Sequence, residues 1–252
     1  MGVAGVRGGQ ARVETLGCCI VTSGVVRERL ARVRERVAAA CESAGRDASD
    51  VALLLATKTQ DTATIRAALV AAGDAPVLLG ENRVQELVAK APQLADLSPT
   101  WHVIGPLQSN KVNAALRWAS CIESVASIDL ARRLAERATG RLDVMVQVNV
   151  SGEPTKHGVT PAAAAELAQE VAGLPGLRLV GFMTVGARSS DASVVAAGYD
   201  ALRAVRDDVL ASGLTGTGDA RHLSMGMSGD LELAIACGAT LVRVGTAVFG
   251  SR

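Results

Sequence analysis

Short apolar runs alternate along the chain with longer amphipathic segments. The runs predict eight strands, at residues 51–57, 76–80, 100–105, 120–124, 142–150, 177–185, 220–225 and 240–245. The segments between them predict helices at residues 61–72, 82–94, 109–118, 127–139, 161–173, 192–212 and 230–236. Because strands that alternate with helices form parallel sheets, this order predicts a (β/α)8 TIM-type barrel, with a doubly wound sheet as the alternative.

An additional amphipathic helix is predicted at residues 25–44, ahead of the first strand. Its apolar face recurs at steps of three and four residues, at Val26, Leu30, Val33, Val37, Cys41 and Ala44. The chain ends seven residues after the eighth predicted strand, which is too few for a full closing helix. We therefore expect the N-terminal helix to cover that gap in the outer ring. Residues 1–23 are predicted to be a flexible extension, and residues 24–252 a single barrel domain.

Composition and charge exclude several classes of function. The 26 Lys+Arg and 25 Asp+Glu residues nearly cancel, and aromatic residues make up only 2% of the chain. We therefore expect neither nucleic-acid nor membrane-surface binding. No apolar run reaches the roughly 18 residues of a membrane span. The five cysteines form no CxxC pair and no metal-ligand spacing, which is typical of reduced thiols in a cytoplasmic protein.

The first predicted strand is followed by a lysine. The apolar run VALLLA at residues 51–56 leads directly into Thr57 and Lys58. One explanation is that Lys58 simply reaches solvent, as most lysines do. The other is functional, because the carboxyl ends of barrel strands carry the active site. An unprotonated, desolvated lysine amine there can attack a carbonyl group.

Glycine and hydroxyl residues follow the seventh and eighth predicted strands. The first loop is SMGMSGD at residues 224–230, and the second contains GT at residues 245–246. Such loops expose backbone amides, and TIM barrels often bind a phosphate at these two places. The alternative for the first loop is an ordinary glycine turn with Ser228 near a helix cap. The presence of both residue types in both loops favours a phosphate cradle.

Arg243 lies inside an apolar strand, so it needs either an ion-pair partner or a polar ligand. Glu123 and Glu81 are candidate partners at strand ends. A lysine amine opposite a phosphate cradle suits a phosphorylated aldehyde, and pyridoxal 5'-phosphate is such a molecule. An arginine beside its pyridine nitrogen would oppose protonation of the ring and weaken it as an electron sink.

Several motifs carry a resemblance to a known family over residues 26 to 250. They are ATKTQ around Lys58, GENRVQE at 80–86, WHVIGPLQSNK at 101–111, QVNVSGEPTKHG at 147–158, GFMTVG at 181–186, LSMGMS at 223–228 and RVGTAVFG at 243–250. In these motifs the chain resembles the YggS/PROSC family of pyridoxal phosphate homeostasis proteins, which is similar in fold to the barrel domain of alanine racemase.

The resemblance implies a role for individual residues. Lys58 would hold pyridoxal 5'-phosphate as a Schiff base, Asn82 would lie near the cofactor, and Arg243 would face the pyridine nitrogen. The residues implied to hold the phosphate are Ser224, Gly226, Ser228, Gly245 and Thr246. Lys156 is a candidate for a second, weaker contact. The chain departs from the family pattern at Thr57, Gln60, Asp61 and Leu79, none of which is an implied contact.

The expected function is binding of pyridoxal phosphate in intracellular homeostasis of the cofactor, without substantial catalysis. Apo enzymes that use the cofactor are candidate recipients. The alternative is an amino-acid racemase, in which Lys58 would be one base. Alanine racemases supply a tyrosine from a second domain as the other; we expect no such domain here, and Tyr199 is predicted to lie mid-helix, away from any strand end. A phosphate-binding barrel isomerase is a weaker third alternative.

No catalytic residue and no metal site is predicted. The three histidines, His102, His157 and His222, are far apart in the sequence and show no metal-ligand spacing. Each is expected to be a polar strand-end or loop residue.

Overall fold

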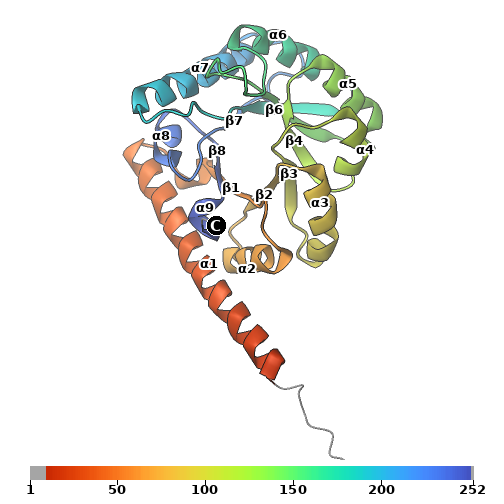
Figure 1. Ribbon diagram of the computed structural model, residues 1–252. Coiled ribbons are helices and arrows are strands. Elements are labelled where there is room, and N and C mark those ends of the chain that lie inside the picture. The colour runs from red at the N-terminus through yellow and green to blue at the C-terminus, as the bar shows by residue number, and fades with distance from the viewer. Residues whose placement is uncertain (1–9, 251–252) are drawn as a thin grey trace, which may run out of the picture.

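Eight parallel strands close into a barrel in chain order. The computed structural model describes residues 10–250, and the side chains of residues 23–250. The strands are β1 (Ala52–Ala56), β2 (Leu78–Glu81), β3 (Thr100–Val103), β4 (Ala119–Val125), β5 (Leu142–Gln147), β6 (Leu177–Met183), β7 (His222–Ser224) and β8 (Leu241–Val244). Figure 1 shows this ring of strands inside a ring of helices. The TIM-type barrel prediction is confirmed, and the doubly wound alternative is wrong.

The outer ring follows the predicted order of helices. It contains α2 (Thr62–Ala72), α3 (Val84–Lys90), α4 (Val112–Ala115), α5 (Ile128–Arg137), α6 (Pro161–Ala172), α7 (Ala192–Ala211), α8 (Leu231–Ala236) and α9 (Thr246–Phe249). The predicted helix at 82–94 is interrupted, since α3 gives way to the 3-10 segment Ala91–Leu97. Pro92 lies at the start of this 3-10 segment, and proline lacks the N–H that a continuing α-helix needs.

The N-terminal helix α1 spans Gln10–Ser43 and packs against α2, α8 and α9. It lies beside the short helix α9, where the outer ring would otherwise be incomplete (Figure 1). The structure gives residues 10–23, which we expected to belong to a flexible extension, as the first turns of α1. Residues 1–9 of that extension lie outside the described residues. The domain boundary at residue 24 stays a prediction.

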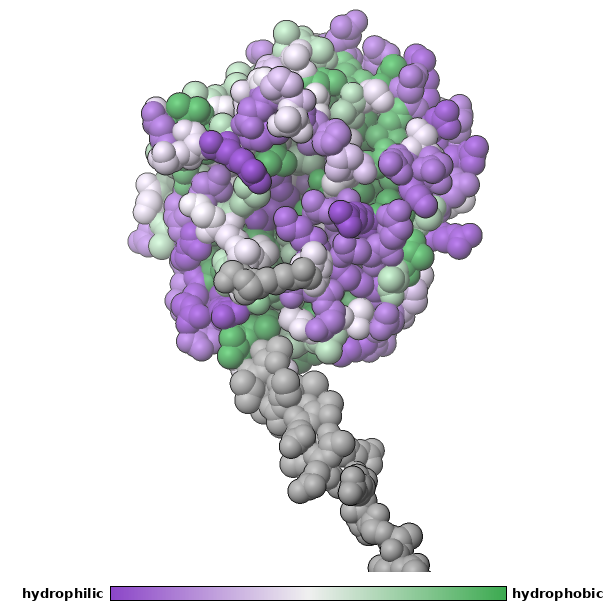
Figure 2. Space-filling model, in the orientation of Figure 1, coloured by the Kyte–Doolittle hydropathy of each residue, from purple (hydrophilic) through white to green (hydrophobic). Residues whose placement is uncertain are grey.

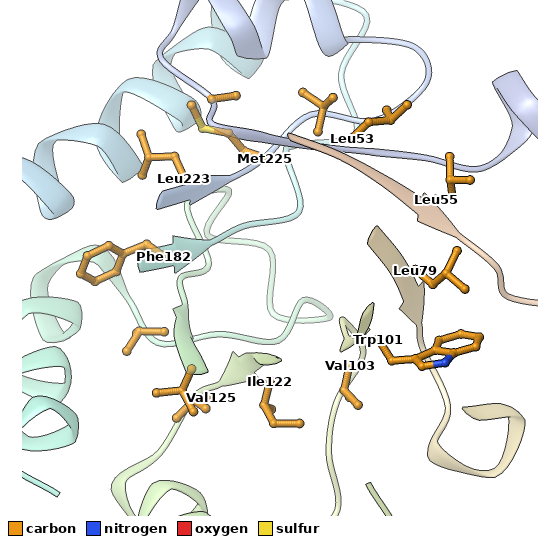
Figure 3. Close-up of a cluster of buried hydrophobic side chains, with 14 of the residues drawn as sticks. Leu53, Leu55, Leu79, Trp101, Val103, Ile122, Val125, Phe182, Leu223 and Met225 are labelled. Atoms are coloured by element: carbon orange, nitrogen blue, oxygen red, sulfur yellow. The ribbon is translucent and has the colours of Figure 1, made fainter. Parts of the chain in front are cut away.

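Successive side chains of a strand point to opposite faces of the sheet, so the buried apolar residues form two layers. The larger layer lies between the strands and the helices, and Figure 3 shows members such as Leu53, Leu79 and Phe182 around the outside of the ring of strands. The smaller layer fills the barrel and contains Leu54, Cys121, Met145, Val180, Met183 and Leu241. The barrel interior is closely packed beside Gly80, where an added Cβ would lie 2.4 Å from Leu54 Cδ2.

The register of three neighbouring strands brings distant segments of sequence together. Leu55 pairs with Val244 across β1 and β8, and Ala56 pairs with Gly80 across β1 and β2. The segments after β8, β1 and β2 therefore leave the barrel side by side at its carboxyl end. The segment in the middle begins with Thr57 and Lys58.

The molecular face in Figure 2 is mostly hydrophilic, with smaller apolar areas between the charged side chains. Among the described residues, no helix is both long and apolar enough to cross a membrane.

Candidate cofactor site

Lys58 lies in the turn directly after β1, and its side chain is exposed. Within residues 23–250 it makes no hydrogen bond or ion pair. The end of β8 is close by, because a Cβ added at Gly245 would lie 3.3 Å from the carbonyl oxygen of Ala56. The Lys58 amine is therefore uncommitted and is carried next to the loop that follows β8.

The Lys58 turn is held in a strained conformation. Thr59 has a φ of 65°, in the left-handed region that is unfavourable for a β-branched residue by about 1–2 kcal/mol. Its backbone N–H donates to Glu86 Oε2 at 2.9 Å, and the Thr57 hydroxyl donates to Glu81 Oε1 at 2.7 Å. Both residues that flank Lys58 are thus fixed by carboxylates of the next β–α unit. Strain that is fixed in this way is typical of functional sites.

A buried lysine ties those carboxylates together. Lys90 Nζ donates to Glu81 Oε1 at 2.6 Å, to Glu86 Oε2 at 2.9 Å and to the carbonyl oxygen of Thr57 at 2.8 Å. Burial raises the pKa of Glu81 despite this cation. For Glu86, burial is outweighed by the hydrogen bonds from Thr59 and Lys90, which lower its pKa. We call Thr57, Glu81, Glu86 and Lys90 the turn-anchoring cluster.

The loops after β7 and β8 meet at one serine. Ser228 Oγ accepts hydrogen bonds from the backbone N–H groups of Gly245 at 3.3 Å and Ala247 at 3.2 Å. Two N–H groups already donate to this oxygen, so its own proton points elsewhere and is available to an anion. Thr246 lies between the two donors, with an exposed side chain. Together these groups form a donor-rich cradle at the start of α9.

The additional helix α1 supports this cradle. Arg36 donates to the carbonyl oxygen of Ser228 at 3.1 Å and forms a bidentate ion pair with Glu232, at 2.6 and 2.9 Å. Arg36 therefore ties α1 to both the loop after β7 and the helix α8 that follows it.

Gly226 and Asp230 shape the same loop. Gly226 has a φ of 89°, and a Cβ there would lie 2.4 Å from the Cβ of Ala234, so only glycine fits. Asp230 Oδ1 accepts the N–H of Met227 at 2.6 Å, and Asp230 Oδ2 accepts the hydroxyl proton of Tyr199 at 2.7 Å. The expectation that Tyr199 lies away from any strand end needs correction, because α7 directs its buried hydroxyl onto this loop.

A chain of hydrogen bonds crosses the barrel interior from Arg243. Arg243 Nη1 donates to Ser224 Oγ at 2.7 Å, and Ser224 Oγ donates to Glu123 Oε2 at 2.5 Å. The other carboxylate oxygen, Glu123 Oε1, lies 2.6 Å from His102 Nδ1. All four side chains are buried. We call Arg243, Ser224, Glu123 and His102 the interior relay.

The interior relay contains one compensated pair of charges. Burial alone would raise the pKa of Glu123, but the hydrogen bond from His102 and the charge of Arg243 hold it below its ordinary value. Burial lowers the pKa of Arg243, and the Glu123 charge opposes that shift. An ionised carboxylate only accepts hydrogen bonds, so the His102 proton lies on Nδ1. Of the two carboxylates considered from the sequence, Glu123 is thus the partner of Arg243, through Ser224, whereas Glu81 pairs with Lys90.

Asn82 follows β2 and is half-buried beside the β3 loop. A Cβ at Gly105 would lie 2.3 Å from the carbonyl oxygen of Asn82, so glycine allows the two segments to touch. The structure thus places Asn82 at the same barrel end as Lys58, two residues beyond the Ala56–Gly80 pair.

Two of the residues implied to contact the cofactor have side chains that already bond to other parts of the protein. Ser224 is fully buried and its hydroxyl is committed to the interior relay, so we remove it from the phosphate donors and assign it to the support of Arg243. Lys156 Nζ is 2.8 Å from Glu153 Oε1 and 2.7 Å from the Gly186 carbonyl oxygen, so its charge is already paired. The remaining residues, Lys58, Asn82, Gly226, Ser228, Arg243, Gly245 and Thr246, belong to the carboxyl-end loops or face them.

Sequence reasoning missed the supporting residues Glu86, Lys90 and His102. Lys90 and Glu86 are four residues apart on one helix, a spacing that is also typical of exposed surface pairs. Burial of the Lys90 side chain, which is 10% exposed, distinguishes the two cases. Within residues 23–250, no group of histidine, cysteine, aspartate and glutamate side chains could hold a metal ion.

Comparison with known proteins places this geometry in context. Residues 29–252 match the family described as "Alanine racemase, N-terminal domain". The "Pyridoxal phosphate homeostasis protein" of Pseudomonas aeruginosa is 42% identical over 230 residues, which cover 90% of this chain and 96% of that protein. A solved structure of PipY from Synechococcus elongatus with pyridoxal phosphate bound has a TM-score of 0.77 at 33% identity, covering 89% of this chain and 100% of PipY. A crystal structure from Bifidobacterium adolescentis has a TM-score of 0.87 at 45% identity, covering 91% of this chain and 96% of that one.

The fold and the site therefore define a barrel protein of the alanine racemase N-terminal type, with a strand-end lysine beside a donor-rich cradle. Within that class, the chain belongs to the family of pyridoxal phosphate homeostasis proteins.

Proposed function

We propose that the protein binds pyridoxal 5'-phosphate through Lys58 and acts in the intracellular homeostasis of this cofactor. One observation carries the proposal: the register of β1 and β8 sets the uncommitted Lys58 beside the Ser228–Gly245 cradle. In support, PipY binds the same molecule in a related structure. We place the protein in the cytoplasm, because Cys41, Cys121 and Cys237 are free thiols.

The residues present fit both the aldehyde group and the phosphate group of the cofactor. Bound pyridoxal phosphate supplies an aldehyde for an amine and a ring that can withdraw electrons. The Lys58 amine has no competing partner within residues 23–250. Gly226 and Gly245 allow the loops to pack closely, and the hydroxyl groups of Ser228 and Thr246 supply hydrogen-bond donors without a lysine. Arg243 is fixed in position by its hydrogen bond to Ser224, which in turn donates to Glu123.

The same residues favour a carrier over a racemase. A two-base racemase needs an acid on each side of the reacting carbon. Tyr199, the only tyrosine, donates a hydrogen bond from its hydroxyl to Asp230. Burial, together with this carboxylate, raises its pKa well above the ordinary value. Arg243, as a permanent cation, opposes protonation of a pyridine nitrogen beside it. We therefore propose a protein that holds the cofactor and releases it to apo enzymes.

Negligible racemase activity is expected toward alanine, serine and glutamate. The reason is that Tyr199, the one tyrosine of the chain, is hydrogen-bonded to Asp230, and that Arg243 opposes protonation of the pyridine ring. The test is deuterium exchange at the amino-acid α-carbon with chiral analysis, using a known alanine racemase as positive control. Turnover in the typical enzyme range of about 1–1000 per second, abolished by Lys58→Ala, would establish a racemase instead.

Ser228→Ala should weaken binding of pyridoxal phosphate about tenfold or more while leaving pyridoxal binding nearly unchanged. A hydrogen bond to a charged group is worth about 1.5–3 kcal/mol, and about 1.4 kcal/mol corresponds to a factor of ten. The measurement is equilibrium binding of both ligands. Ser224→Ala is the matched comparison and should affect both ligands alike, because Ser224 acts through Arg243. Equal losses for both ligands in Ser228→Ala would remove Ser228 from the phosphate cradle.

A further inference from the structure

A cavity lies at the opposite end of the barrel from Lys58. Its volume is about 620 Å3, and its rim is formed by the first residues of the strands, such as Ala52, Leu78 and Thr100. Small-molecule sites typically measure about 300–1,000 Å3 and combine an apolar surface with a few polar groups. The size of this cavity is therefore that of a ligand site, although barrel sites normally lie at the carboxyl end.

The floor of this cavity is apolar. It is formed by Cys121, Met145, Val180 and Leu241, which are all buried members of the inner apolar layer. A short hydrocarbon group would be covered there by apolar side chains.

One cation in the wall of the cavity is left without an ion-pair partner among residues 23–250, because one of the two lining aspartates pairs with an arginine outside the lining. Asp143 pairs with Arg178 in a bidentate contact at 2.6 and 2.5 Å, and Asp219 pairs with Arg141 at 3.1 Å. Both acidic groups that line the cavity are thus neutralised. Arg221 forms no ion pair with any residue in 23–250, and its one hydrogen bond, from Nε to the Gly218 carbonyl oxygen at 3.1 Å, leaves both terminal nitrogens open.

A hydrogen-bonding pair lies close to this arginine. His222, the residue after Arg221, places Nδ1 3.3 Å from Thr240 Oγ1, and both residues line the cavity. From these observations we infer that the amino-terminal mouth of the barrel binds a small aliphatic carboxylate. Its hydrocarbon part lies on the apolar floor, and its carboxylate pairs with Arg221 near His222. This site does not depend on the proposed cofactor function.

The experiment is a titration of the full chain with butanoate, followed by NMR of methionine methyl groups labelled with 13C. Met145 reports on the cavity floor, whereas Met227, which is 42% exposed, reports on the loop after β7 at the other end. We expect a saturable shift of the Met145 signal, with a dissociation constant on the order of 1 mM for so small a ligand. The Met227 signal should not move. Adding excess pyridoxal phosphate should leave the Met145 response intact.

Variants and an uncharged analogue make the result decisive. Arg221→Gln should weaken butanoate binding about tenfold, as loss of a charged hydrogen-bond donor would. Arg27→Gln, at another exposed arginine, should change nothing. Butan-1-ol, which has the hydrocarbon part without the charge, should bind much more weakly than butanoate. The inference is overturned if Met145 does not respond, if Met227 responds instead, if butan-1-ol binds equally well, or if Arg221→Gln binds as the parent does.

Discussion

Replacing Lys58 with alanine should abolish the covalently bound form of pyridoxal phosphate. The parent protein should be yellow, with an absorption band that borohydride removes while fixing a pyridoxyl group to one lysine. Lys58 is the expected site because its amine is uncommitted and the register of β1 and β8 carries it next to the phosphate cradle. The measurement is an absorption spectrum before and after reduction, followed by peptide mapping of the label.

Lys111→Ala is the matched control. Lys111 ends the 3-10 segment Ser109–Lys111 in the loop after β3, so it is a second lysine in a strand-end loop. Its removal should leave the band intact. A label on Lys111, or a band that persists in Lys58→Ala, would show that the wrong lysine has been assigned.

The fold could be predicted because apolar strands and amphipathic helices alternate without interruption. Local sequence determined the order of the elements, and the expectation that the N-terminal helix covers the outer ring beside β8 agrees with the packing of α1 against α8 and α9. Element ends were less predictable. The predicted helix at 109–118 contains only the short α4, Val112–Ala115, after a 3-10 turn. An apolar pattern sets the face of a helix but does not show where backbone hydrogen bonds change register.

The strand-end rule located the candidate site but not the contacts inside the barrel. It identified Lys58, Ser228 and Gly245, since a parallel barrel gathers the carboxyl ends of its strands. The rule could not show that Ser224 turns to Glu123, 101 residues away in sequence. That contact requires both side chains to point into the barrel, from β4 and from β7, and to lie at the same height along the barrel axis. Sequence alone left Ser224 as one of two equivalent serines in a loop.

Support from helices was the least predictable part of the site. Lys90 occupies a helix position that in sequence resembles an exposed partner of Glu86. Only the packing of α3 against β2 buries it beneath the Lys58 turn. Its three contacts then join a carboxylate of β2, a carboxylate of α3 and the backbone of residue 57.

Lys90→Met should destabilise the protein by about 3–5 kcal/mol at neutral pH, because it leaves Glu81 as an unpaired buried charge. For a domain of this size, the expected fall in melting temperature is roughly 10 °C. Glu81 is fully buried, and burial already raises its pKa. Removing the cation raises that pKa further. The unfolded carboxyl titrates near its ordinary pKa, so the loss of stability should be small below that pH and grow as the pH rises towards the higher folded pKa.

Two further variants separate loss of the charge pair from loss of packing. Adding Glu81→Gln to Lys90→Met should recover much of the stability at neutral pH, since no buried charge remains. Arg66→Met removes the cation of an exposed pair, in which Arg66 and Asp96 are 39% and 61% exposed, and should cost at most about 1 kcal/mol. The measurement is thermal and urea unfolding of each variant at acidic and neutral pH. A Lys90→Met deficit independent of pH, or no recovery in the double variant, would mean that Lys90 acts through packing.

Lys90→Met should also weaken pyridoxal phosphate binding, because Thr57 loses the donor that fixes the Lys58 turn.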